Sequence, residues 1–599
     1  MSDQTWPKRS EIPVEETWDL TRIFETHDAY RKSIEACTEE VARFVSDYAT
    51  KLSDLDTPEL IAAYKRYENI SNTLSDGYSY LNCMADVDLS NSENAKNIAA
   101  HKSLTAKIYA QLSFFEGALM RCPKERIEAA TKDPYCGPYF EDILRRMPHY
   151  LSDEKEELLA LLGPTLSFPM EAYETTKALD TPFSPFEAAG KSYPLSYVLY
   201  ENSYAVSDNK ELRRKSFAAF CEGLKVTRNS IACDYNAQVQ KEKILATLRG
   251  FDSVIDYLLF DQKVDRELYD RQIDVIMEHF APVMRRYATL LKKRLGLEEI
   301  YFSDLRANLF SNERENISLD EAAQYIEKAV APMGQDYSHL VMRYQKERWV
   351  DFAMNQGKVT GGYCGSSSQG HPYVLLSWNG TMSELYTLAH ELGHGANFVL
   401  GAKNNCSHHA LMPMYLIEAP STFHELLLSH ARLQEAQNEN EKDQVYADML
   451  AKTYYHNFVT HLLEAHYQRE VYRLVDEGQQ LGADDFDRLM MQTLKAFWGD
   501  AVVIEEGAKM TWMRQPHYYM GLYSYSYSAG LTIATKMFLR LQNEPEAAAK
   551  DWLRFLAYGD RGTVREMAQI GGVDLKDDRA LRETIDFLSD VVAQLEAKS

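Results

Sequence analysis

Helical periodicity runs through most of this 599-residue chain and restricts the folds open to it. Over residues 16–160, apolar side chains recur at spacings of three and four, and Gly and Pro are sparse. The same patterning returns over 208–345 and again from 382 to the end. No internal repeat at a fixed period is evident, which disfavours a helical solenoid. We therefore predict a mainly α protein, large and multi-helical.

Two stretches interrupt the helical pattern. Residues 361–378 are the most strand-like, with a Gly- and Ser-rich turn followed by the β-branched and aromatic run Pro372–Trp378, so we expect one small sheet there. Residues 180–193 contain Pro182, Pro185 and Gly190 and fit a linker or a short hairpin. We place the main boundary near this second break, which gives an N-terminal helical lobe over 1–200 and a second unit over 201–599.

Composition excludes several classes of function. The chain carries 89 acidic against 65 basic side chains, a formal charge of -24, which disfavours nucleic-acid binding. The first residues are polar, and no run of about 18 or more apolar residues occurs, so we predict neither secretion nor membrane spanning. The eight cysteines are scattered without a C-x-x-C pair, which is typical of a reducing, cytoplasmic compartment. The oligomeric state is left open, and a monomer is compatible with the sequence.

The segment His390-Glu391-Leu392-Gly393-His394 carries the strongest chemical signal. It lies in a helical pattern, and its two histidines are four residues apart, so both imidazoles can leave one helix face and meet one ion. This is the H-E-x-x-H arrangement of zinc hydrolases, in which Glu391 is placed to accept a proton from water. The alternative is two structural histidines on one helix.

A catalytic zinc needs a third protein ligand and one open position. The metzincin pattern would place a histidine at position 400, which is Leu400 here, so that pattern is excluded. Glu418 can bring a carboxylate from a second helix, and His424 is a weaker alternative. Glu425 lies seven residues after Glu418 on the same predicted face, so one can bind the metal while the other orients a ligand.

Three other histidines recur every five residues, at His456, His461 and His466. In an α-helix this spacing rotates each side chain by more than a full turn from the last, which spreads them around the axis. We therefore predict that they are surface or packing residues and not ligands.

With these residues in view, the chain resembles the thimet-oligopeptidase superfamily of zinc metallopeptidases, and more closely its oligoendopeptidase F branch. Four separated segments carry the resemblance: Glu15–Leu20; Gly361–Tyr363 with Pro372–Trp378; His390–His394 with Glu418–Ser421; and His517–Tyr527. The resemblance implies a zincin-type peptidase body with a small β-sheet next to a deep substrate channel. It also implies one Zn²⁺ per chain and makes 201–599 the catalytic domain.

The resemblance also assigns roles to single residues. It makes His390, His394 and Glu418 the zinc ligands and Glu391 the general base. In the tyrosine-rich loop, the resemblance implies that a histidine and tyrosines stabilise the oxyanion of peptide hydrolysis. We assign this role to His517 and Tyr525, and Tyr518 is the next candidate. The other loop tyrosines are expected to pack at a helix interface: Tyr519, Tyr523 and Tyr527.

The strand-like stretch is the expected substrate-binding element. Pro372–Trp378 could form an edge strand whose free backbone groups pair with an extended peptide. The residues expected to bind substrate are Gly361, Gly362, Tyr363, Tyr373 and Val374. An ordinary structural hairpin would show the same pattern.

Together these features predict a cytoplasmic zinc endopeptidase that hydrolyses internal bonds of short oligopeptides. Two alternatives stay open: a zinc carboxypeptidase of similar helical fold, and a non-catalytic peptide-binding protein with a structural metal.

Overall fold

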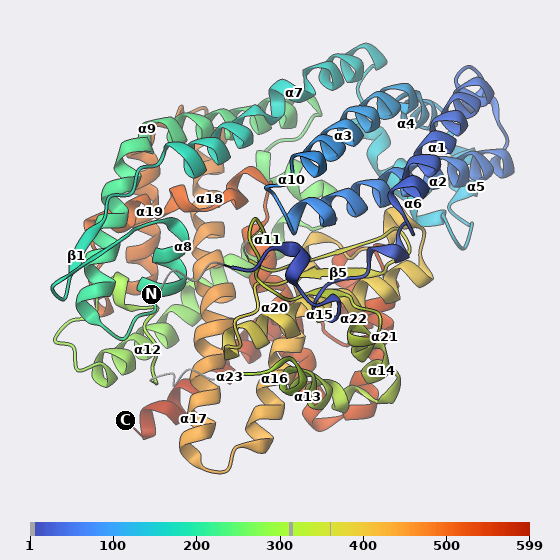
Figure 1. Cartoon of the computed structure of the whole chain (residues 1–599). Helices are drawn as coiled ribbons and strands as arrows, with labels where there is room; N and C mark the ends of the chain where they lie inside the picture. The colour runs from blue at the N-terminus through green and yellow to red at the C-terminus, as the bar shows by residue number, and fades with distance from the viewer. Residues whose placement is uncertain (1–5, 311–315, 360, 599) are drawn as a thin grey trace.

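A computed structural model describes residues 6–310, 316–359 and 361–598. Helices make up almost all of the regular structure, and the strands form only two small sheets (Figure 1). The prediction of a mainly α protein with little sheet is confirmed. None of the described helices combines the length and apolarity needed to cross a bilayer.

The N-terminal helices build a hydrophobic core of their own. They are α1 His27–Tyr48, α2 Thr57–Asp86, α3 Ser92–Leu112, α4 Phe114–Met120, α5 Lys124–Ala130 and α6 Gly137–Arg146. Local signals set the starts of the first two, because the Thr26 hydroxyl caps α1 and Asp56 forms a capping box with Glu59 at α2. Their shared core includes Phe44, Leu60 and Phe115, each fully buried.

The rest of the chain packs around a second and larger core that begins at Tyr173 and runs to Leu595. Its elements up to the sheet are α7 Asp153–Thr175, the hairpin strands β1 Phe186–Ala188 and β2 Lys191–Tyr193, α8 Tyr197–Leu199, α9 Lys210–Leu248, α10 Val254–Asp261, α11 Arg266–Val275, α12 Ala281–Arg294, α13 Leu319–Val330 and α14 Gln335–Lys346. The break predicted at 180–193 is therefore a hairpin. The domain division at residue 200 stays a prediction.

Along the chain, a three-stranded sheet follows these elements and precedes the remaining helices. It consists of β3 Val350–Asp351, β4 Tyr363–Ser366 and β5 Pro372–Leu375, in the order β3-β5-β4. The expectation that Pro372–Trp378 forms an edge strand was wrong, because β5 pairs on both sides and β4 is at the edge. The two-residue partner β3 is too short to leave a recognisable strand pattern in the sequence.

The helices after the sheet are α15 Met382–Asn404, α16 Ala419–Glu435, α17 Glu439–Asp448, the π-helix η13 Met449–Thr460, α18 His461–Asp476, α19 Ala483–Trp498, the 3₁₀ turn η16 Pro516–Tyr519, α20 Ser524–Asn543, α21 Pro545–Tyr558, α22 Val564–Ile570 and α23 Arg579–Ala597. Figure 1 shows α15, α16 and α20 close together in the middle of the molecule, under β5.

Two glycines allow α15 and α20 to press against the start of α16. A Cβ atom on Gly393 of α15 would lie 2.4 Å from the Pro420 carbonyl oxygen. A Cβ atom on Gly530 of α20 would lie 2.7 Å from the Ala419 nitrogen and 2.9 Å from the Glu418 Cβ. Such distances are closer than any side chain tolerates, so glycine at both positions fixes the turn at residues 418–420 against the helix that carries His390 and His394.

Candidate active site

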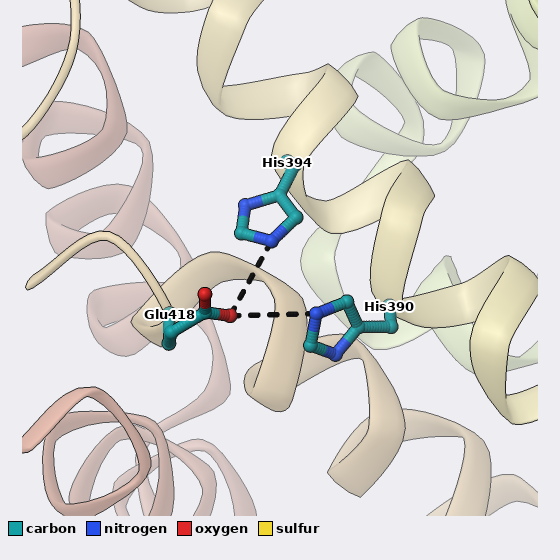
Figure 2. Close-up of side chains that lie close together, drawn as sticks. All are labelled: His390, His394 and Glu418. Carbon is teal, nitrogen blue, oxygen red and sulfur yellow. Dashed lines mark ion pairs between the residues drawn. The ribbon is translucent and has the colours of Figure 1, made fainter. Parts of the chain in front are cut away.

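The two histidines of the H-E-x-x-H segment and Glu418 meet at one point (Figure 2). His390 and His394 leave adjacent turns of α15, and Glu418 is the residue immediately before α16. The Nε2 atom of each histidine lies 3.4 Å from Oε2 of Glu418. The His390 side chain is 22% exposed whereas that of Glu418 is 6% exposed, so solvent reaches the group from the His390 side.

This geometry fits a tetrahedral metal ion. Zinc bonds of about 2.0–2.2 Å to nitrogen and oxygen place neighbouring ligand atoms about 3.3–3.6 Å apart, and both measured separations fall in that interval. Two imidazoles and one carboxylate leave a fourth position open, as catalytic zinc sites do. Burial opposes the charge on Glu418, but the two histidines outweigh it and hold the pKa of this carboxyl well below its usual range.

Glu425 lies behind His390 and orients it. Its Oε1 is 2.7 Å from His390 Nδ1, and its Oε2 accepts a hydrogen bond from the Thr453 hydroxyl. A carboxylate at Nδ1 keeps the proton on that nitrogen and leaves the Nε2 lone pair free for a metal. In the same way, the Ser421 hydroxyl donates to Oε2 of Glu418 at 2.9 Å.

His424, the weaker alternative ligand, points away from this group. Its Nε2 lies 2.7 Å from the Tyr337 hydroxyl and its Nδ1 lies 3.1 Å from the Ala389 carbonyl oxygen. Burial lowers the pKa of His424 to about 3, so it is a neutral core residue.

Glu391 follows His390 on α15 and is also buried. Burial raises the pKa of its carboxyl above the ordinary value. Tyr523 faces the same region, since its hydroxyl contacts Glu418, and burial together with the nearby charges of Glu418 and Glu391 raises the pKa of its phenol. A second buried carboxylate, that of Glu391, therefore lies near His390, His394 and Glu418.

The tyrosine-rich loop reaches this site through His517 and through two tyrosines that are expected from the sequence to pack at a helix interface. The Tyr523 hydroxyl donates to Oε1 of Glu418 at 3.4 Å, and the His517 ring stacks on Tyr523 with centroids 5.2 Å apart. Tyr527 packs against both Tyr523 and His517, with centroids 5.4 and 5.6 Å away. The structure thus brings His517, Tyr523 and Tyr527 together on the side of Glu418.

Tyr525 and Tyr518 lie elsewhere. The Tyr525 hydroxyl donates to Gln262, and its ring packs on Tyr269. Tyr518 is 1% exposed and packs against Tyr235. The geometry of helix α20 explains why Tyr525 points away from this site.

Because α20 begins at Ser524, residues four apart share a face while the residue between them points to the opposite side. The spacing of Tyr523 and Tyr527 was the signal that could have found them.

The expected substrate-binding residues divide into two groups. Tyr373 and Val374 are buried in the middle of the sheet, at 1% and 0% exposure, so they are core residues. Tyr363 lies on the edge strand, and its hydroxyl donates to Asp86 of α2 at 2.6 Å. Gly362 fits tightly against Thr387 of α15, and Gly361 has a φ of +101°, a conformation that favours glycine.

A second cluster lies next to the loop and includes two of the three histidines that recur every five residues. His461 and Glu464 approach His517 closely enough to form another group of potential ligands, and His456 contacts His461. The expected α-helical rotation would spread these histidines around the axis, but residues 449–460 form a π-helix with i→i+5 bonding, which brings His456 and His461 side by side. His461 is buried in this cluster.

Known protein families and proteins match most of this chain. The profile of peptidase family M3 matches residues 203–587, and that of oligopeptidase F matches residues 119–183. Oligopeptidase PepF of Bacillus subtilis is 25% identical, with 98% of this chain and 88% of that protein covered. The plasmid-encoded oligoendopeptidase F of Lactococcus lactis subsp. cremoris is 23% identical, with 98% of both chains covered.

Solved structures share the fold. The crystal structure of oligoendopeptidase-F from Enterococcus faecium superposes with a TM-score of 0.72 at 20% identity, covering 97% of this chain and 99% of that one. A crystal structure from Chlamydophila abortus reaches a TM-score of 0.84 at 23% identity, covering 99% of this chain and 100% of the other. The helical body and its small sheet are therefore those of known peptidase structures.

Proposed function

Because this chain belongs to peptidase family M3 and carries the oligopeptidase F segment, we propose that it is a zinc-dependent endopeptidase of short oligopeptides. The observation that carries the proposal is the convergence of His390, His394 and Glu418, with Nε2 to Oε2 separations of 3.4 Å. Peptide hydrolysis follows from the family; the metal and the role of each residue are our inference.

His390, His394 and Glu418 would hold one Zn²⁺ per chain. The ion would supply Lewis-acid polarisation of the scissile carbonyl and lower the pKa of the attacking water. Glu425 orients His390 for this purpose. Glu391 takes the proton from the attacking water and passes it to the leaving amine.

His517, Tyr523 and Tyr527 supply the donors for the oxyanion. Imidazole N–H and phenol O–H groups stabilise negative charge most strongly where water is excluded, and the rings of this loop are packed against one another beside the ligands. Tyr523 is the nearest of the three to the metal ligands, since its hydroxyl already contacts Glu418.

The edge strand β4 binds the substrate backbone. An extended peptide that adds to an exposed strand is held mainly by main-chain hydrogen bonds, so binding depends little on side-chain sequence. We infer a deep substrate channel over this strand, which would admit oligopeptides and exclude folded proteins. We also propose a cytoplasmic location, which the eight free cysteines support.

The Glu391→Gln variant tests the mechanism directly. We expect it to retain about one zinc ion per chain and to lose roughly 10²–10⁴-fold in kcat, because the amide cannot accept the proton. The measurement is zinc content by mass spectrometry alongside initial rates on a quenched fluorescent peptide. Unchanged hydrolysis by Glu391→Gln would overturn this role for Glu391.

Product analysis separates the alternatives. Internal fragments support an endopeptidase, whereas release of single C-terminal residues would show the carboxypeptidase alternative. Binding of peptides without turnover by zinc-loaded protein would show the non-catalytic alternative.

A further inference from the structure

Glu464 stands at the centre of a hydrogen-bonded group that ends on His517. It lies on α18, is 5% exposed, and accepts three hydrogen bonds at one oxygen, Oε2. The donors are His461 Nδ1 at 2.8 Å, the Ser524 hydroxyl at 3.0 Å and His517 Nδ1 at 3.5 Å. The histidines outweigh the effect of burial and hold the pKa of Glu464 well below its usual range, so a buried anion faces the loop.

His456 completes this group from the π-helix η13. Its Nε2 lies 3.0 Å from Nε2 of His461, and a hydrogen bond between two imidazole nitrogens requires one donor and one acceptor. Burial holds the pKa of His456 well below the ordinary value, so His456 is neutral. We call His456, His461, Glu464 and His517 the histidine relay.

The contacts order the members of the relay. His461 donates from Nδ1 to the Glu464 carboxylate, and its Nε2 shares a hydrogen bond with Nε2 of His456. His517 contacts the same carboxylate oxygen through its own Nδ1, so the relay fixes one nitrogen of this ring and leaves Nε2 free for another partner.

The distances favour a relay over a second metal site. The 2.8 Å separation of His461 Nδ1 and Glu464 Oε2 is a hydrogen bond, and it is shorter than the roughly 3.3 Å that two tetrahedral zinc ligands require. By contrast, both separations in the His390, His394 and Glu418 group have the value expected for a metal.

We propose that Glu464, supported by His461 and His456, is the positioning residue that holds the His517 ring at Nδ1, so that its opposite ring nitrogen, Nε2, serves the oxyanion. This inference rests on the proposed function, in which His517 is an oxyanion donor. The His517 ring is stacked on Tyr523, whose hydroxyl contacts Glu418, which places the end of the relay beside the metal ligands. The His517 contact at 3.5 Å is long, as catalytic hydrogen bonds often are without substrate.

A double-mutant cycle tests the relay on the zinc-loaded full chain. We expect Glu464→Gln to lower kcat about 10–100-fold with KM changed less than about twofold, because the variant disturbs the group that orients His517 and leaves the proposed metal ligands and the substrate strand unchanged. His517→Gln should lose about 10²–10³-fold in kcat. The double variant should be no slower than His517→Gln alone, since the effect of Glu464 passes through that ring.

Two further variants serve as controls. Glu464→Asp retains the carboxylate and should recover part of the lost kcat. Glu470→Gln lies on the same helix but pairs only with the surface residue Arg473, so its kcat should equal that of the wild type.

Three outcomes would overturn the relay: losses that multiply in the double variant, a Glu464→Gln effect confined to KM, or two bound metal ions per chain. Should Glu464→Gln fail to fold, ¹⁵N-histidine NMR of the wild type decides instead. The relay predicts a hydrogen-bonded proton on Nδ1 of His517, and an Nδ1 that carries no proton would contradict it. Glu391→Gln separates this failure from failure of the proposed function, because its loss of turnover does not depend on Glu464.

Discussion

At the scale of single residues, the proposed metal ligands show how much local spacing can predict. The spacing of His390 and His394 predicts that they share a helix face, whereas Glu418 was chosen among nearby candidates only through the family resemblance. Tyr525 lies away from this group because the start of α20 decides the face of each ring, and the four-residue spacing of Tyr523 and Tyr527 is the only local sign of that face. Glu464 could not be found, since only the folded chain brings it to His517.

The contact of Glu425 with His390 gives a prediction at this scale. Glu425→Gln removes the negative charge behind the ligand while keeping the shape of the side chain, so it should weaken zinc binding about 10–100-fold. Competition with a chromophoric chelator measures the affinity. Glu435→Gln, on the same helix but at the surface beside Lys328, is the matched control and should bind zinc as the wild type does. Equal affinity for both variants would contradict the orienting role of Glu425.

At the scale of elements, the site depends on how closely three helices approach. Gly393→Ala would place a methyl group 2.4 Å from the Pro420 carbonyl oxygen and force α15 away from the start of α16. We expect a loss of stability of about 1–3 kcal/mol and weaker zinc binding, because the ligands stand on both sides of this contact. Gly163→Ala, where a Cβ meets nothing within 4 Å, should cost far less. Thermal midpoints with and without zinc measure both effects.

The contact between α9 and α18 predicts a pH dependence. Glu242 is buried, accepts hydrogen bonds from Tyr472 and Gln238, and has its pKa raised by burial to about 7. Because the folded pKa exceeds the unfolded value of about 4.3, the stability linked to this proton is complete below pH ~4 and is lost as pH rises through 7. Glu242→Gln should therefore gain on the order of 3 kcal/mol relative to wild type between pH 5 and pH 9. Parallel pH profiles of the thermal midpoints would contradict this.

The elements themselves were predictable where their signals are local. The long helical periodicity over residues 16–160 predicts that the N-terminal core is helical, and the caps at Thr26 and Asp56 are local signals for the starts of α1 and α2. The π-helix η13 and the strand β3 were not predictable, because tertiary packing decides both and neither has a distinctive period over so few residues.

At the scale of the whole molecule, a small hydrophobic cluster joins α2 to the sheet between the two larger cores. It contains Trp18, Cys83, Val87, Tyr373 and Leu375. Asp76 of α2 accepts hydrogen bonds from the Ser368 amide and hydroxyl at 2.6 and 2.7 Å, and Asp86 accepts from Tyr363 on the edge strand. The N-terminal helices therefore hold the strand that we propose for substrate binding. This arrangement joins residues almost three hundred positions apart, which explains why the sequence predicted a strand at Pro372–Trp378 but only a turn where β4 lies.

Removal of the metal should lower the stability of the whole fold. Ligands on α15 and at the start of α16 are joined only in the folded state, so zinc at 100 times its dissociation constant should stabilise the protein by about 2.7 kcal/mol. The thermal midpoint should fall on chelation and return with added zinc. A midpoint independent of zinc would contradict a single site formed by these three residues.

The most direct test of the central claim is mass spectrometry of the products from a mixed peptide library, with and without chelator, and with one folded protein as a control. We predict internal cleavage of short peptides by zinc-loaded enzyme, loss of that cleavage with chelator or in Glu391→Gln, and an intact folded protein. Absence of cleavage by zinc-loaded wild type, or internal cleavage that persists in full after the metal is removed, would contradict the account.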